Sequence, residues 1–326
     1  IYRLEPAYSY IKPLPQDSPL PPVPDQTFAP FENENFSARR ILRKLYECLH
    51  QAGYNEANIC NLLGVSSQQQ IEPTYLHYYD RYRLPQSILG DLIRLFLLRC
   101  ALTESRLQEI FGNELFSTLC SLGMLIQRDQ DWASRVDLFA VAGLYVATDH
   151  RYMILAEDHF DEDVVMYVGM DSMGLVYTAP QYPANRILDL CCGSGIQSLV
   201  ASRYAKEVIG VDINPRAIRF ARFNAQLNGV SNINFYLGNL YEAAPGYFDT
   251  ILANPPFVPS PSQECCFRDG GMGGEEILAR IITESANKLT PQGRLFIVTD
   301  LVNLQEYESK LEQWWQGGPA HKLVLN

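Results

Sequence analysis

The sequence predicts an α/β protein in which a doubly wound, largely parallel sheet follows a mainly helical domain. Three observations lead to this fold class. From residue 186 onward, short apolar segments typical of buried strands alternate with segments of helical periodicity. A glycine-rich turn follows the first of these strands, as in sheets that bind ligands at their carboxyl edge. By contrast, residues 36–122 show helical spacing almost throughout, which predicts a separate helical unit in front of the sheet.

Length, charge and cysteine spacing limit the classes of protein that this chain can belong to. At 326 residues it exceeds one average domain, so two domains are expected. The net charge of −11 argues against a broad contact with nucleic acid, which requires a basic surface. No apolar run approaches the ~20 residues that span a bilayer, so no membrane segment is expected. The 8 cysteines include no C-x-x-C pair, which indicates reduced thiols in a cytoplasmic protein and no metal site.

The first 146 residues are expected to form an arm and a helical domain. Residues 1–35 read as a proline-rich, extended arm, because proline at this density excludes a helix. The domain that follows, residues 36–146, is expected to contain helices at 36–52, 88–96, 104–111 and 114–122. Two strands, 125–126 and 136–141, are expected to pair as a hairpin around polar residues 127–135. Three helices and a hairpin resemble a winged-helix module.

A winged helix often reads DNA, but here a docking or scaffold function is the better interpretation. The helix at 114–122, which would enter the groove, contains no Lys, Arg or Gln and begins with Glu114. The remaining basic residues are expected to lie on solvated helix faces. They form two groups: Arg39, Arg40, Arg43 and Lys44, and then Arg81, Arg83, Arg94 and Arg99.

Residues 147–326 are expected to form the α/β domain. Strands at 151–156, 164–168 and 174–178 are predicted first, interrupted by an acidic run at 157–163 that reads as a solvated loop; His150 and His159 lack a convincing set of metal ligands. The sheet strands that follow are predicted at 186–190, 207–211, 233–237, 248–253 and 294–298. The covering helices are predicted at 196–204, 215–227, 275–289 and 303–315.

The glycine turn predicts a site for a nucleotide-like cofactor. Gly193 and Gly195 follow the strand that contains Asp189 and open the next helix, so the backbone can approach a ligand closely. Asp212 ends the next strand, about twenty residues on, where a carboxylate accepts hydrogen bonds from both ribose hydroxyls. Asp189 either reaches the far end of the cofactor or fixes the turn. A pair of glycines alone is weak evidence for a cofactor site. Asp212, at the expected distance along the chain, strengthens the prediction.

The segment Asn254-Pro255-Pro256-Phe257 predicts a site that grips a planar nitrogen. An amide or exocyclic amine is a poor nucleophile because its lone pair is delocalised. If the Asn254 side-chain oxygen and the Pro255 carbonyl each accept one N–H, the nitrogen is held with its lone pair directed at an electrophile. The prolines restrict the backbone, and Phe257 can stack on the planar group. The alternative interpretation, a plain turn between strand and helix, is weaker beside the upstream glycine turn.

Taken together, residues 186–298 resemble a class I, Rossmann-like methyltransferase that uses S-adenosylmethionine (SAM) and carries an N-P-P-[FY] motif. The similar groups are release-factor glutamine N5-methyltransferases, "small-domain" ribosomal RNA guanine N2-methyltransferases and adenine N6-methyltransferases. The segments that carry the resemblance, beside the two motifs, are residues 211–217, 223–229 and 267–271. It implies SAM contacts from Asp189, Cys191, Gly193, Gly195, Asp212, Ile213, Asn239 and Leu240.

Within that set, Asn239 is expected to accept from the adenine amine, with Ile213 and Leu240 on the two faces of the ring. Three features depart from the family. Asn239 stands where Asp is commoner, and the front domain is larger than the helical bundle of release-factor enzymes. In addition, the given sequence stops soon after a candidate for the sixth strand at 321–325, so the strand that follows it in this fold is expected to be missing.

The predicted function is therefore SAM-dependent N-methylation of a macromolecule. A protein glutamine, in a release factor or a ribosomal protein, is preferred over an RNA or DNA base because the chain is acidic. A small-molecule amine comes third. The non-enzymatic alternative is a winged-helix regulator that senses SAM, but a sensor does not need the Asn254 motif. Nothing in the sequence indicates an oligomeric state.

Overall fold

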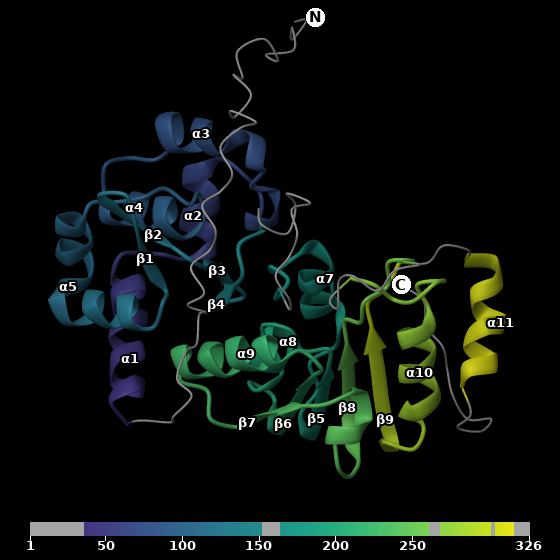
Figure 1. Cartoon of the computed structure of the whole chain (residues 1–326). Helices are drawn as coiled ribbons and strands as arrows, with labels where there is room; N and C mark the ends of the chain where they lie inside the picture. The colour runs from purple at the N-terminus through teal and green to yellow at the C-terminus, as the bar shows by residue number, and fades with distance from the viewer. Residues whose placement is uncertain (1–35, 152–163, 261–267, 301–303, 316–326) are drawn as a thin grey trace, which may run out of the picture.

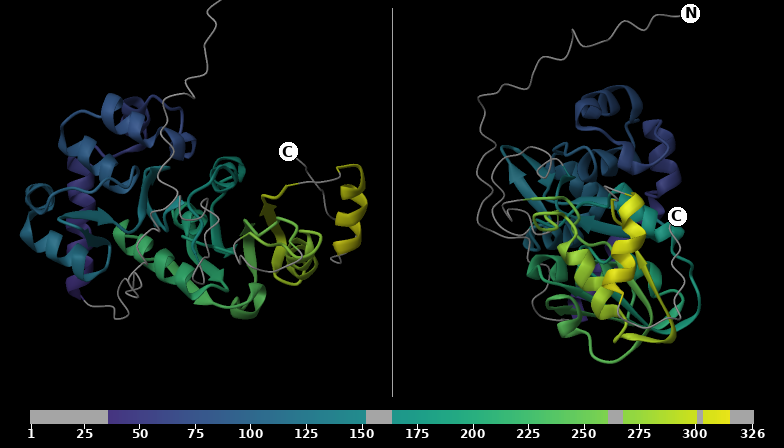
Figure 2. Two further views of the ribbon diagram at one scale, coloured as in Figure 1. Left: turned by 45° about the horizontal axis from the view of Figure 1, so that its top comes forward. Right: turned by 90° about the vertical axis from the view of Figure 1, so that its right-hand side faces the viewer.

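The helical front and the sheet lie side by side in the computed structural model, with the front domain at one end and the last helices at the other (Figures 1 and 2). The structure describes residues 36–151, 164–260, 268–300 and 304–315. In these ranges, no helix has the length and apolar character needed to cross a membrane. The proline-rich arm, the expected strand at 151–156 apart from Arg151, the acidic run at 157–163 and the expected strand at 321–325 lie outside the described residues.

The sheet has the doubly wound, parallel arrangement that the sequence predicts. Its strands are β5 (Ala184–Leu190), β6 (Ala205–Asp212), β7 (Ile233–Leu237), β8 (Phe248–Ala253) and β9 (Leu289–Ile297). They lie in the order β7-β6-β5-β8-β9, and every neighbouring pair is parallel. The chain therefore winds outward from β5 in one direction, then returns and winds outward in the other. The change of direction places the ends of β5 and β8 next to each other, where such sheets bind ligands.

Alternate residues of the strands bury against different helices on the two faces of the sheet. Leu188, Val211 and Ile251 belong to a core that includes Ile281 of α10 (Glu276–Ser285). The neighbouring strand residues, such as Ile187 on β5, pack with α7 (Met170–Thr178) and α8 (Ile196–Ala201). Beyond α10 stands α11 (Leu304–Trp314) (Figure 2). Period-two burial in a sheet covered on both sides explains why these strands read as nearly continuous apolar runs.

The front domain consists of four longer helices and a tyrosine-rich connection. The helices are α1 (Phe36–Gln51), α2 (Glu56–Leu63), α4 (Ile88–Phe96) and α5 (Glu104–Ser121). The connection contains η2 (Gln68–Gln70), η3 (Pro73–Tyr75), α3 (Leu76–Tyr78) and the π-helical turn η4 (Tyr79–Arg83). Gly112 has φ 72°, which breaks α5 into the two helices that the sequence predicts. The helix α2 was missed. The winged-helix likeness stays a prediction.

The predicted pairing of strands after α5 is wrong. Instead of one hairpin there are two: β1 (Leu125–Arg128) pairs with β2 (Asp131–Ser134), and β3 (Asp137–Val141) pairs with β4 (Leu144–Thr148). The polar residues that resembled a loop are strand residues on both sides of a tight turn at Asp129, where φ is 55°. In a short two-stranded sheet one face stays exposed, so polar side chains are compatible with strands.

Two further strand predictions fail between residues 164 and 178. The segment 164–169 has no regular secondary structure, and the expected strand at 174–178 is part of helix α7. A short apolar run fits a buried helix as well as a strand, so periodicity alone does not separate them. The error matters for function, because the first turn of α7 reaches the site described below.

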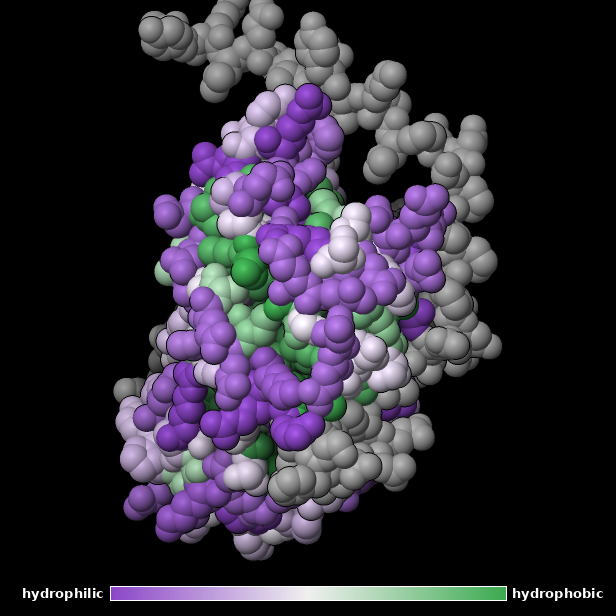
Figure 3. Space-filling model, turned by 90° about the vertical axis from the view of Figure 1, so that its left-hand side faces the viewer, coloured by the Kyte–Doolittle hydropathy of each residue, from purple (hydrophilic) through white to green (hydrophobic). Residues whose placement is uncertain are grey.

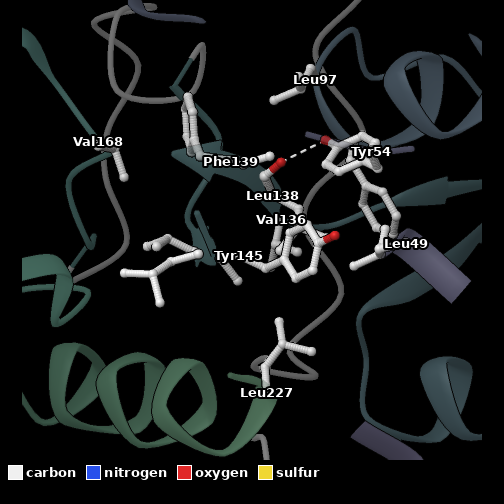
Figure 4. Packing of buried hydrophobic residues seen from close by; sticks show 14 of the residues in the cluster. Leu49, Tyr54, Leu97, Val136, Leu138, Phe139, Tyr145, Val168 and Leu227 are labelled. Atoms are coloured by element: carbon white, nitrogen blue, oxygen red, sulfur yellow. Dashed lines mark hydrogen bonds between the residues drawn. The ribbon is translucent and has the colours of Figure 1, made fainter. Parts of the chain in front are cut away.

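One hydrophobic core continues from the front domain to helix α9 (Pro215–Leu227) (Figure 4). Leu49 and Leu227 lie in this same cluster, and the buried Tyr54 hydroxyl donates to the Leu138 carbonyl at 2.6 Å. The expected domain boundary between residues 146 and 147 falls inside β4. The front domain is thus packed onto α9 and not merely tethered to it.

The face of the molecule on the front-domain side is mostly hydrophilic, with a smaller apolar area near its centre (Figure 3).

Candidate functional site

The strand register brings both sequence motifs to one edge of the sheet. Leu190, the last residue of β5, is the Cα partner of Val211 on β6 and of Ala253 on β8. Asp212 is in turn paired with Leu237 on β7. The residues that follow these positions, which include the glycine turn and Asn254, therefore emerge side by side. The expectation that the motifs converge at the carboxyl ends of the strands is correct.

The glycine turn has the backbone conformation for which glycine is needed. Gly193 has φ 52° and Gly195 has φ 82°, both in the left-handed region. A Cβ on Gly195 would lie 3.1 Å from the Cβ of Ala221, so glycine also lets α8 approach α9. A Cβ on Gly193 would meet no atom of the described residues within 4 Å, so these residues leave the space beside the turn open. Cys191 adopts φ 55° without being glycine, a strained conformation of the kind that clusters at functional sites.

Asp212 holds the turn in place. Its Oδ2 accepts from the Gly193 N–H at 2.8 Å, and its Oδ1 accepts from the Asn214 N–H at 2.9 Å. Burial raises the pKa of this carboxyl above its ordinary value. Each carboxylate oxygen has a second lone pair, so these bonds leave acceptor capacity for hydroxyl groups of a ligand.

Asp189 offers an unused acceptor beneath the turn. Its Oδ2 accepts from the Ser198 N–H at 2.9 Å and the Ser198 hydroxyl at 2.6 Å. Its Oδ1 is buried and has no hydrogen-bond partner among the residues that the structure describes. Burial raises the pKa of the Asp189 carboxyl to about 7, against the lowering effect of the Ser198 bonds. A buried, unpartnered carboxylate oxygen beside an open glycine turn fits a cofactor that carries an amino group.

The next two strand ends present apolar surface and an amide. Ile213 is 56% exposed and Leu237 is 57% exposed, so both offer flat apolar area to a ring. Leu240 has φ 50° and its side chain is buried in the core of the sheet. The Asn239 Oδ1 accepts from the Arg280 Nη1 at 3.3 Å and keeps one further lone pair. Sequence reasoning named Ile213, Asn239 and Leu240 but did not name Leu237.

Asn254 follows β8, and its carboxamide has a defined orientation. Its Nδ2 donates to the Asp171 Oδ2 at 3.1 Å and to the Ser172 Oγ at 3.2 Å. A carboxylate only accepts hydrogen bonds, so the amide nitrogen must face Asp171 and the Oδ1 must face away. Asp171 and Ser172 open helix α7. Sequence reasoning missed both because it assigned no helix there; an Asp-Ser pair before an apolar run was the available signal.

The loop that contains Asn254 is braced by a second segment. Val258 donates to the Arg268 carbonyl and accepts from the Gly270 N–H, both at 2.9 Å. A Cβ on Gly270 would lie 2.8 Å from the Pro256 carbonyl oxygen, and one on Gly274 would lie 2.5 Å from the Phe257 carbonyl oxygen. Glycine is therefore required for this close approach. Pro255 is buried, whereas Pro256 and Phe257 are half-buried.

Arg40, Lys44 and Arg94, which belong to the two basic groups noted in the sequence, are paired with acidic side chains. Arg40 and Lys44 both bind Glu114, and the Lys44 contact holds the pKa of that carboxyl below its ordinary value. Arg94 is buried between Asp80 and Asp91. These pairs neutralise part of the positive charge that a contact with phosphates would need.

The described residues also account for the histidine considered as a metal ligand. His150 is buried, with Nδ1 2.7 Å from the Asp137 Oδ1 and Nε2 2.9 Å from the Ser134 carbonyl oxygen. Across the residues that the structure describes, no group of three or more His, Cys, Asp or Glu side chains is arranged to hold a metal ion. His150 therefore fastens β3 to the segment after β4.

Comparisons with known proteins identify the family. A family model described as the methyltransferase small domain matches residues 168–317. A putative protein N5-glutamine methyltransferase of Methanocaldococcus jannaschii is 37% identical over 150 residues, which are 44% of this chain and 76% of that protein. A release factor glutamine methyltransferase of Thermodesulfovibrio yellowstonii is 30% identical over 127 residues, 35% of this chain and 46% of that protein. A 23S rRNA uracil C5-methyltransferase of a Shewanella species is 43% identical over 91 residues, 26% of this chain and 20% of that protein.

The chain thus spans three quarters of the length of the first relative and less than half of the other two. The family model covers the whole parallel sheet, together with α7 and the Asn254 loop. With one relative of 37% identity covered over 76% of its length, the chain belongs to the methyltransferase small domain family and is a methyltransferase with the class I fold.

Proposed function

We propose that this methyltransferase transfers a methyl group from SAM to the side-chain amide nitrogen of a protein glutamine. The observation that carries this proposal is the Asn254 carboxamide, which Asp171 and Ser172 hold with its oxygen facing away from α7. Asn254 follows β8, the strand that pairs with β5 ahead of the glycine turn, so acceptor and cofactor would meet at the boundary between β5 and β8.

The cofactor would occupy the open side of the glycine turn. The Asp189 Oδ1, which has no partner in the described part of the chain, would accept from the amino group of SAM, and Asp212 would accept from the ribose hydroxyls. Ile213 and Asn239 would contact the adenine, with Cys191, Gly193, Gly195 and Leu240 completing the set that the sequence predicts. When bound, SAM supplies a methyl group on a positively charged sulfur.

The chain's own residues would hold the acceptor nitrogen. The Asn254 Oδ1 and the Pro255 carbonyl would each accept one N–H of a primary amide, which fixes the plane of that amide. Phe257, on the same braced loop, would stack on it. Because the loop is already held by its contacts with residues 268–274, little entropy is lost when the acceptor binds. Positioning of this kind can lower a barrier by several kcal/mol, without a strong base.

Several observations support a protein acceptor over a nucleic acid. Two of the relatives are named as glutamine methyltransferases, and one of these acts on a release factor. The chain has a net charge of −11, and Arg40, Lys44 and Arg94 are paired with acidic residues. We propose a release factor or a ribosomal protein as the partner. A cytoplasmic location suits the six described cysteines, all of them free thiols.

The test is transfer of a labelled methyl group from SAM to acceptors in a cell extract. Three proteins are compared: the wild type, Asn254→Ala, and Asn234→Ala as a matched control. Asn234 is exposed on β7. Within the described residues its side chain makes one hydrogen bond, from Nδ2 to the Glu207 Oε1 at 3.4 Å. We expect the wild type and Asn234→Ala to transfer equal amounts of label, and Asn254→Ala to transfer none. We expect protease treatment to remove the label.

Each other result has a defined meaning. Label that nuclease removes would replace glutamine by a nucleic acid base as the acceptor. Label that is unaffected by Asn254→Ala would contradict the function given to this residue. If SAM binds but no macromolecule is labelled, a small-molecule acceptor or a SAM sensor becomes the better explanation.

A further inference from the structure

Two asparagines on helix α9 bind the free edge of strand β4 in the same way. The Asn224 Oδ1 accepts from the Ala147 N–H at 2.8 Å, and its Nδ2 donates to the Ala147 carbonyl at 2.9 Å. The Asn228 Oδ1 accepts from the Tyr145 N–H at 2.9 Å, and its Nδ2 donates to the Tyr145 carbonyl at 2.7 Å. Each carboxamide therefore replaces one residue of a neighbouring strand.

The spacing of helix and strand explains why two such contacts form. Residues four apart on a helix are separated by ~6 Å along the axis. Residues two apart on an antiparallel strand are separated by ~6.8 Å and face the same edge. Asn224 and Asn228 thus match Tyr145 and Ala147 closely. Within the described residues β4 pairs only with β3, so this edge would otherwise expose or bury unpaired backbone groups.

Only one of the two asparagines also reaches the glycine turn. The second hydrogen of the Asn224 Nδ2 is donated to the Ser194 carbonyl at 2.9 Å. Ser194 lies between Gly193 and Gly195, and Asn224 is fully buried. The corresponding second bond of Asn228 goes to the Asn224 carbonyl of its own helix, at 2.7 Å. Asn224 therefore joins three elements: β4, α9 and the turn.

A carboxamide is rigid and planar, so its three bonds fix the geometry of all three partners at once. If the Ser194 carbonyl moves away from Ala147, a hydrogen bond is lost at a fully buried site. An unsatisfied buried polar group is costly, so the two segments will tend to move together.

We propose that Asn224 is a positioning residue that couples the β4 edge of the front domain to the glycine turn, so that SAM binding and docking of the front domain stabilise each other. This rests on the proposed cofactor site. Because the coupling is a free energy shared by both events, it acts in both directions. A substrate protein that binds the front domain would then change the affinity of the chain for SAM.

The test compares Asn224→Ala with Asn228→Ala in the full chain. Both variants lose the paired contact with β4, so we expect both melting temperatures to fall, and that of Asn224→Ala to fall further because Asn224 is fully buried and also binds Ser194. Only Asn224→Ala also releases Ser194, so we expect its Kd for SAM, measured by calorimetry, to rise about tenfold. For Asn228→Ala we expect a change of less than about twofold.

A second measurement uses the wild-type chain and does not depend on the folding of a variant. The Ala147 and Tyr145 amides donate to Asn224 and Asn228, respectively. We expect saturating SAM to slow hydrogen exchange of the Ala147 amide several-fold more than that of the Tyr145 amide, as measured by NMR.

The outcomes separate this coupling from the proposed function. If the wild type binds SAM but the two variants lose affinity equally, or the two amides respond equally, the coupling is wrong and the cofactor site stands. If the wild type does not bind SAM, both proposals are overturned.

Discussion

The orientation of Asn254 depends on Asp171, and substituting Asp171 by Ala tests this dependence directly. In the structure the Asn254 Nδ2 lies 3.1 Å from the Asp171 Oδ2 and 3.2 Å from the Ser172 Oγ. Only the carboxylate selects the orientation, because a hydroxyl both donates and accepts. Without Asp171 the carboxamide can turn over and present its N–H groups to the acceptor amide, which also donates. That orientation cannot support transfer.

The magnitude follows from the kind of bond that is lost. A hydrogen bond to a charged group contributes about 1.5–3 kcal/mol. Asp171 is half-buried, and the distance is at the long end of the usual range, so we take about 1.5 kcal/mol. This corresponds to about a tenfold fall in the rate of methyl transfer. Asp171→Asn retains an oxygen that can accept, so its rate should fall only about two- to threefold, as should that of Ser172→Ala.

The assay measures the initial rate of label transfer at saturating SAM, with the Kd for SAM measured separately. We expect the rates to decrease from wild type to Asp171→Asn to Asp171→Ala, while the Kd changes by less than about twofold. A purely structural function for Asp171 would lower the melting temperature and the SAM affinity together. A wild-type rate for Asp171→Ala would refute the reasoning, as would a loss confined to SAM binding.

Three further predictions concern the cofactor site and the junction with the front domain. Asp212→Ala removes the acceptor for the Gly193 N–H, so SAM affinity by calorimetry should fall about tenfold or more; an unchanged affinity would disprove the ribose assignment. The pKa of Asp189 is about 7 in the folded chain and about 4 in the unfolded chain. Between about pH 4 and pH 7 the folded state therefore binds a proton that the unfolded state does not. Its contribution to the free energy of unfolding should therefore decrease as pH rises from about 4 to 7, and urea titrations of Asp189→Asn should lack this decrease. Tyr54→Phe leaves the Leu138 carbonyl unsatisfied and should lower the free energy of unfolding by about 1–2 kcal/mol, without a change in SAM affinity.

The sheet and the edge where the two motifs converge could be predicted because each signal there is local. The strands at 233–237 and 248–253 match the predicted ranges, since buried parallel strands are short apolar runs between turns. Gly193 and Gly195 could be placed because a turn into a helix requires left-handed backbone at those positions. Asn254 follows its strand as expected, with its side chain half-buried.

The partners of these residues could not be predicted, because they depend on contacts between distant segments. Asp171 and Asn254 are 83 residues apart, and no periodicity relates them. The segment that contains Asp171 also reads equally well as strand or helix. The two hairpins after α5 depended on tight turns at Asp129 and at Ala142, both non-glycine residues with positive φ, which sequence patterns seldom signal.

The junction changes how the front domain should be regarded. In the sequence it reads as a separate module that would present a substrate, and a module of that kind could be removed without harm to the SAM site. In the structure Leu49 and Leu227 share one core, and Asn224 connects β4 to the Ser194 carbonyl. Removing the front domain would expose α9 and leave the Asn224 carboxamide with one partner segment instead of two. The front domain is therefore joined to the glycine turn where SAM is proposed to bind, so substrate recognition is better studied with surface substitutions than with a truncated chain.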